Sequence, residues 1–175
     1  VVKSTQGKVV FNLDATAQTR LGYLGHTHYG TIFLENRYTD WGNYYPHWTL
    51  RNLWMMLPYV PADRLQMEFL NVERNQEKYA DDPLSPYQSG QVYAFMAVAF
   101  TNPLAWMETT GLSESQLRAL SQVINAIKPH HSAILGGHVL PIGDEPSGVS
   151  WTGFQSIIDA HNGYVLVIRE KHKQS

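Results

Sequence analysis

Ten residues that suit the binding of a sugar are gathered between positions 35 and 47. They follow the short apolar segment Ile32–Leu34, and a helical pattern of leucine and tryptophan begins directly after them. Carboxylates, amides and arginine hydrogen-bond hydroxyl groups, while aromatic rings cover the apolar face of a pyranose. Because α/β enzymes hold ligands at the carboxyl ends of strands, this segment is the leading candidate for a ligand site. The residues are Glu35, Asn36, Arg37, Tyr38, Asp40, Trp41, Asn43, Tyr44, Tyr45 and His47.

The composition narrows the class of protein without fixing its function. The 175 residues carry a net charge of −2 and no block of like charges, so nothing predicts a nucleic-acid partner. No apolar run approaches the roughly 18 residues of a membrane helix. Cysteine is absent, which excludes disulfides and thiolate metal sites. The chain starts without methionine or a signal-peptide pattern, so we expect it to begin inside a longer protein.

The first 130 residues alternate between strand and helix patterns. Strands are predicted at Val9–Leu13, Ile32–Leu34 and Leu65–Leu70, and helices at His47–Leu57 and Pro86–Thr101. This alternation favours βα units whose strands are parallel. If the strands are parallel neighbours, the polar residues after each strand meet at one rim of the sheet.

The remainder of the chain has a different pattern. Ser113 and Gln116 form a capping box that predicts a helix over Ser113–Lys128. Beyond it, glycine and proline separate short strands, and Asn162-Gly163 predicts a hairpin turn. A complete (β/α)8 barrel needs roughly 200 residues or more. We therefore expect an α/β fold in which 1–130 form the carboxyl-terminal portion of such a TIM barrel and 131–175 a β-sandwich-type domain.

Three segments resemble the carboxyl-terminal part of α-galactosidase-like glycoside hydrolases, the family 36 group of the α-galactosidase clan. Leu13–Arg20 is similar to the polar stretch with an arginine that ends a late barrel strand in that family. Glu35–Asp40 is similar to the carboxylate-rich turn after the next strand, with Glu-Asn in place of the family's Ser-Asp. Gly163–Glu170 is similar to the family's closing sandwich strand.

The resemblance implies a retaining glycosidase that acts on a galactoside-type carbohydrate without a cofactor. Such enzymes use two carboxyl groups about 5 Å apart. In the family the nucleophile lies on an earlier barrel strand, and the acid/base lies on the turn that here carries Glu35 and Asp40. We rank these two nearly equal, and Asp14 is better placed to bind hydroxyls. The rest of the barrel is thus an expected partner, and we expect this chain alone to be inactive.

Several further residues are expected to bind the substrate around these carboxylates, and Trp41, Tyr44 and Tyr45 are the candidates for stacking on the sugar. The expected binding residues are Arg20, Asn36, Arg37, Trp41, Tyr44, Tyr45 and His47. Each carboxylate taken singly is equally well explained as a solvated loop charge or a helix N-cap.

Two other functions stay open. His26 and His28 in a glycine-rich loop resemble the start of an amidohydrolase-type metal site, which would need further ligands at strand ends. The further ligands would come from Glu35, Asp40, His47 and His138. We expect solvated histidines and no metal. The second alternative is a non-catalytic carbohydrate-binding module. A homo-oligomer is a further possible partner arrangement for this chain.

Overall fold

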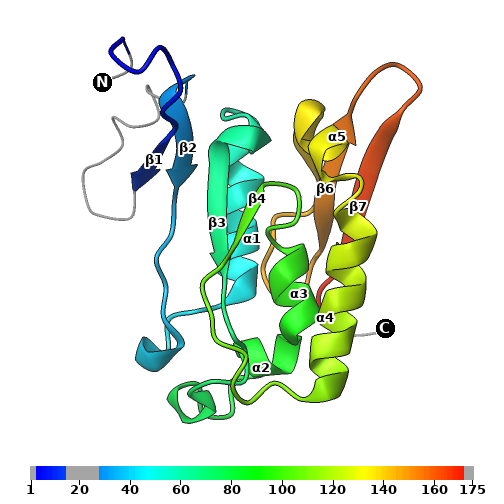
Figure 1. The fold of residues 1–175 in the computed structure, drawn as a ribbon. Helices are drawn as coiled ribbons and strands as arrows, with labels where there is room; N and C mark the ends of the chain where they lie inside the picture. Colours follow the sequence, from blue (N-terminus) through cyan, green and yellow to red (C-terminus); the bar gives the residue numbers. More distant parts are fainter. Residues whose placement is uncertain (1–2, 15–27, 172–175) are drawn as a thin grey trace.

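The computed structural model describes residues 3–14 and 28–171, and these form a mixed α/β structure with two sheets (Figure 1). The first sheet has four parallel strands in the order β1-β2-β3-β4. The predicted parallel pairing of its first three strands is confirmed. The described strands form an open sheet and not a closed barrel. Its strands are β1 (Phe11–Asp14), β2 (Gly30–Phe33), β3 (Leu65–Phe69) and β4 (Asn102–Ala105).

Helices connect β2 to β3 and β3 to β4, and further helices lead into the second part of the chain. Figure 1 shows α1 running alongside β3. The capping box is confirmed, because the Ser113 hydroxyl accepts from the Gln116 backbone and the Gln116 side chain accepts from Ser113 N. The α-helices are α1 (Pro46–Met56), α2 (Pro86–Ser89), α3 (Gln91–Met96), α4 (Glu114–Ile127) and α5 (His131–Gly136). The short 3-10 helices are η2 (Thr39–Trp41), η3 (Ala62–Arg64) and η4 (Gln76–Lys78). None of the helices in the described part of the chain is long and apolar enough to cross a membrane.

The second sheet has three antiparallel strands and lies at the opposite end of the molecule from β1 (Figure 1). The predicted terminal hairpin is confirmed, since β6 pairs with β7 across the turn that contains Asn162. The described residues thus supply one antiparallel sheet where a two-sheet sandwich was expected. Its strands are β5 (His138–Gly143), β6 (Trp151–Ile157) and β7 (Gly163–Arg169).

One prediction, a continuous helix over Pro86–Thr101, is wrong. Gly90 has a φ of 86°, which lies outside the helical region and separates α2 from α3. The chain then enters β4, a strand that was not predicted because Asn102-Pro103 is typical of a turn. Pro103 lies on β4, an edge strand among the described strands, and edge strands are where sheets tolerate proline.

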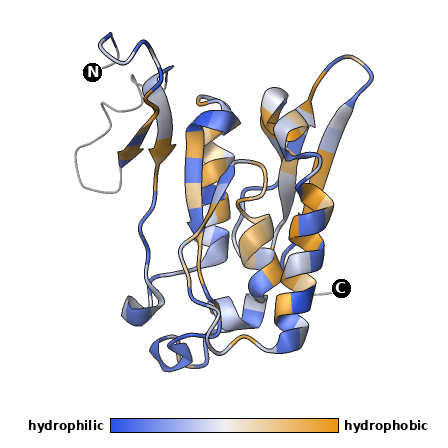
Figure 2. Ribbon diagram, in the orientation of Figure 1, coloured by the Kyte–Doolittle hydropathy of each residue, from blue (hydrophilic) through white to orange (hydrophobic). Residues whose placement is uncertain are grey.

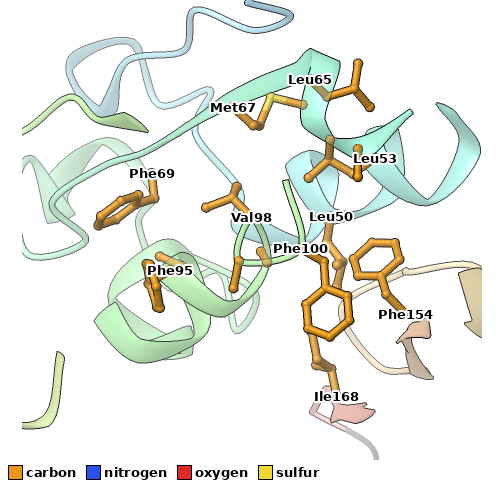
Figure 3. Packing of buried hydrophobic residues seen from close by; sticks show 14 of the residues in the cluster. Leu50, Leu53, Leu65, Met67, Phe69, Phe95, Val98, Phe100, Phe154 and Ile168 are labelled. Carbon is orange, nitrogen blue, oxygen red and sulfur yellow. The ribbon is translucent and has the colours of Figure 1, made fainter. Parts of the chain in front are cut away.

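One hydrophobic cluster joins the two sheets (Figure 3). Leu50 and Leu53, one turn apart on α1, are fully buried in it. Phe100 stacks on Phe154 with ring centroids 6.2 Å apart, which ties the chain before β4 to β6. The loops that follow β2 and β3 are hydrophilic by contrast (Figure 2). The core therefore fixes the strands, and polar side chains gather where the strands end.

Candidate functional site

Two buried glutamates lie at the carboxyl ends of neighbouring parallel strands. Leu34 N donates to Gln66 O at 3.3 Å, which continues the parallel pairing beyond the last residue of β2. This brings the chain at Glu35 alongside β3, where Glu68 is the fourth residue. Both side chains are withdrawn from solvent, with exposed fractions of 8% for Glu35 and 1% for Glu68. Two carboxyl groups so buried call for a physical explanation, because such groups are rarely buried without partners.

Glu35 is held by three side-chain donors. Its Oε1 accepts from Arg37 Nη2 at 3.0 Å and from Asn52 Nδ2. Its Oε2 accepts from Thr49 Oγ1 at 2.8 Å. Thr49 and Asn52 are three residues apart on α1 and therefore share one side of that helix. Both oxygens of Glu35 are thus fixed in place by the strand end and the helix.

Glu68 has far fewer partners. The backbone N–H of Arg37 donates to its Oε1, and its Oε2 has no hydrogen-bond partner among the described residues. Burial raises the pKa of the Glu68 carboxyl to about 7, and the nearby charge of Glu35 acts in the same direction. The Arg37 N–H and guanidinium oppose this shift in pKa without cancelling it. Glu68 therefore changes its protonation state near neutral pH, as a general acid or base must.

Arg37 connects the two glutamates with the surrounding loop. Its Nη1 donates to Asn43 O at 3.3 Å, and the Asn43 side chain accepts from Tyr38 N at 3.0 Å. The guanidinium lies over the ring of Trp48, 5.3 Å from its centroid, in a cation–π contact. Its Nε is buried without a hydrogen-bond partner among the described residues. The cluster thus contains two buried atoms without a hydrogen-bond partner among the described residues. They are the donor Arg37 Nε and the acceptor Glu68 Oε2.

A polar hollow of about 200 Å³, called the rim hollow below, lies over the ends of the parallel strands. It is lined by residues that follow β2, β3 and β4 in the sequence, and Asp40 is one of them. Asp40 is exposed and accepts from Asn75 Nδ2 at 3.2 Å, while Arg74 and Glu108 form an ion pair. Rings, amides and charges of both signs suit a polyhydroxylated ligand. The lining residues are Tyr38, Thr39, Asp40, Leu70, Asn71, Arg74, Trp106, Met107 and Glu108.

In comparisons with known proteins, no family model, curated protein or solved structure matches this chain. We therefore infer function from the geometry of the site.

The structure places the predicted site residues in different surroundings. Glu35 and Arg37 belong to the buried cluster, whereas Asp40 and Trp41 lie on η2, where Trp41 is 71% exposed. Asn36, between Glu35 and Arg37 in the sequence, is exposed. Asp14 ends β1 and is also exposed. Arg20 and His26 lie outside the described residues.

The prediction that Tyr44 stacks on a sugar is corrected by its burial. Its side chain is 1% exposed, and its hydroxyl accepts from Leu70 N at 3.2 Å, so neither ring face is available. Burial raises the pKa of Tyr44 above its usual range. Tyr45 is partly exposed and donates to Asp82 Oδ2 at 2.8 Å. His47 lines hollows other than the rim hollow.

Three residues of the cluster were missed from the sequence: Glu68, Thr49 and Asn52. The sequence signal for Glu68 was weak, because Leu65–Phe69 alternates apolar and polar residues as a half-buried strand does, and Glu68 stands on its polar face. Thr49 and Asn52 are next to the buried Leu50 and Leu53 on α1. They were missed because only the apolar residues of that helix were considered.

The metal-site alternative finds no assembled ligand set. Within 3–14 and 28–171, no group of three or more His, Asp or Glu side chains is placed to hold a metal ion. His28 and His138 are both exposed.

Proposed function

We propose that the chain is part of an α-galactosidase-like retaining glycoside hydrolase and that Glu68 is its proton-transfer group. In this proposal the four parallel strands belong to a (β/α)8 barrel, and β5–β7 belong to a β-sandwich. The observation that carries it is the pair of carboxyl groups at adjacent strand ends, one held by three donors and the other with a pKa of about 7. Pairs of carboxyl groups in contrasting environments are what acid/base catalysis at neutral pH requires.

The proposed reaction uses Oε2 of Glu68, which is buried, has no partner among the described residues and does not line the rim hollow, so sugar binding must displace the chain that covers it. Protonated Glu68 would give its proton from Oε2 to the glycosidic oxygen as the bond from that oxygen to the sugar breaks. A carboxylate on another strand of the barrel, which the family resemblance places before this chain, would attack the sugar carbon. In the second step ionised Glu68 would take a proton from water, which then displaces the enzyme carboxylate and releases the sugar.

The surrounding residues support this role. The charge of Glu35 disfavours ionisation of Glu68, and the Arg37 N–H fixes one oxygen while the buried Oε2 has no partner among the described residues. The rim hollow, which includes Tyr38 from the same loop, offers rings and hydrogen-bonding groups for the sugar. Asp40, which the sequence ranks beside Glu35 as acid/base, lines that hollow and would bind hydroxyl groups.

The test is the dependence of hydrolysis on the leaving group, measured in the full-length enzyme with Glu68→Gln. An alkyl α-galactoside needs protonation of its leaving group, whereas a dinitrophenyl α-galactoside does not. We expect kcat on the alkyl substrate to fall by about 10²–10⁴, with a much smaller fall on the dinitrophenyl substrate. Glu114→Gln, a change at an exposed α4 residue, is the matched control and should leave both rates unchanged.

Asp40→Asn and Glu35→Gln, assayed in parallel, decide between the candidate proton donors. If Asp40→Asn shows the leaving-group dependence and Glu68→Gln hydrolyses both substrates at the wild-type rate, the proton donor is Asp40 and the assignment to Glu68 is wrong. Absence of any glycoside hydrolysis by the full-length protein, with retained sugar binding, would favour a carbohydrate-binding module instead.

A further inference from the structure

A second hollow, called the α1 hollow below, lies at the amino-terminal turn of α1 and shares no lining residue with the rim hollow. Its volume is about 430 Å³. One wall is the start of α1, and the other is the loop that joins β5 to β6. The lining residues are His47, Trp48, Arg51, Glu145, Pro146 and Ser147. The hollow therefore lies where the α/β part of the chain meets the antiparallel sheet.

His47 presents unused hydrogen-bonding groups to this hollow. Its side chain is 6% exposed, yet its imidazole makes no hydrogen bond with any residue in the described part of the chain. Its ring packs against Tyr45 and Trp48, with centroids 5.5 and 6.0 Å away. It lines both the α1 hollow and a smaller one of about 120 Å³ beside Glu170. Its ring nitrogens are not among the buried atoms that lack a partner, so solvent reaches them and a ligand in the hollow can replace that water.

The protonation of His47 suits a neutral ligand. Burial lowers the pKa of His47, and the opposing effect of the Glu170 and Asp82 charges is smaller. The imidazole is therefore neutral at pH 7, with one ring nitrogen as donor and the other as acceptor. That combination matches a hydroxyl group, which also donates and accepts.

The other lining groups complete a surface for a sugar. Trp48 is 40% exposed and offers part of its ring. Arg51 Nε and Glu145 Oε1 form an ion pair whose members are each about half exposed. Because the two charges cancel, the hollow has little attraction for an anion, but it keeps charged donors and acceptors for hydroxyls. The Ser147 hydroxyl, which pairs with Ser150 Oγ at 2.7 Å, adds a further polar group.

We propose that the α1 hollow is a second saccharide-binding site, separate from the rim hollow, which takes a neutral sugar unit between Trp48, His47 and the Arg51–Glu145 pair. The site is argued from the residues of this hollow and not from the hydrolysis proposed above, while the choice of a galactosyl probe rests on the proposed function. Such a site would hold a distant part of a carbohydrate while another part is bound at the rim.

The test is an amide NMR titration of the full-length protein with a thio-linked α-galactosyl disaccharide, whose sulfur linkage resists hydrolysis. We expect saturable shift changes in the backbone amides of 47–51, 145, 147 and 148. Inorganic phosphate, titrated in the same way, should leave these amides unchanged because the lining charges cancel. Shifts confined to the rim residues, no shifts at all, or shifts with phosphate in place of the sugar would overturn the proposal.

A matched pair of variants separates this site from general effects on the surface. Arg51→Gln removes the charged donor of an exposed pair and should raise Kd at the α1 hollow about tenfold. Arg118→Gln breaks the comparable exposed pair with Glu114 on α4 and should leave Kd unchanged. An unchanged Kd in Arg51→Gln would contradict the assignment. Since the readout is binding, it is independent of whether Glu68 transfers protons.

Discussion

Glu68 and Glu170 are both buried near the carboxyl end of a strand, yet their surroundings are opposite. Glu170, which follows β7, is 7% exposed and accepts four hydrogen bonds. Its Oε1 accepts from Tyr93 Oη at 2.6 Å, and its Oε2 accepts from the backbone N–H groups of Ser147, Gly148 and Ser150. Glu68 accepts one hydrogen bond, from the Arg37 N–H.

The difference separates a structural glutamate from a candidate catalytic one. Glu170 gathers the β5–β6 loop and α3 around one carboxylate, so its desolvation is offset by charge-assisted hydrogen bonds. Glu68 lacks these hydrogen bonds, and burial therefore raises the pKa of its carboxyl group to about 7. An incompletely satisfied buried carboxyl group is costly for stability, and retaining one is typical of functional sites.

The largest expected effect on stability comes from removing the carboxylate of Glu170, which accepts four hydrogen bonds. Glu170→Ala leaves three backbone N–H groups and the Tyr93 hydroxyl without their acceptor. We expect the free energy of unfolding to fall by about 3–5 kcal/mol, measured by urea denaturation with an unchanged m-value. A loss below about 1 kcal/mol would mean that water replaces these bonds freely and that the contrast with Glu68 is overstated.

The pH dependence of stability should reveal Glu68 directly. Its pKa rises from 4.5 to about 7 on folding, so between these values the folded state binds more protons than the unfolded state. The stability from this group is thus fully present below pH 4.5 and lost as pH rises through about 7, a change of about 3 kcal/mol. Glu68→Gln lacks this dependence.

The measurement is urea unfolding of the wild type and Glu68→Gln across this pH range. The stability of the wild type relative to the variant should decline as pH rises, because all other titrating groups cancel in the difference. Parallel curves for the two proteins would show that Glu68 titrates alike in the folded and unfolded states.

Much of the architecture could be predicted from local sequence. The parallel pairing of the first three strands was predicted from apolar segments separated by a glycine-rich loop and then by a helical pattern, and the α4 cap from Ser113 and Gln116. The break at Gly90 and the strand β4 could not be predicted in the same way. A glycine permits the positive φ that Gly90 adopts, but the neighbouring sequence does not require it. Strand β4 forms by pairing with β3, which is distant in the sequence.

The candidate site was only partly predictable for a related reason. The polar residues after β2 were identified because they are adjacent in sequence. Glu68 is 33 residues from Glu35 in the sequence, and only the β2–β3 pairing brings the two together. The assignment of Tyr44 to sugar stacking failed because composition does not reveal which aromatic rings of a loop are turned into the core.

The central claim, that Glu68 is poised to transfer a proton near neutral pH, is tested most directly by an NMR titration of its side-chain carboxyl carbon. The resonance is assigned by its absence from Glu68→Gln, and its chemical shift is followed as pH is raised. The account predicts a midpoint near pH 7. A midpoint near the ordinary glutamate value of 4.5 would contradict it and return the acid/base role to Asp40 or Glu35.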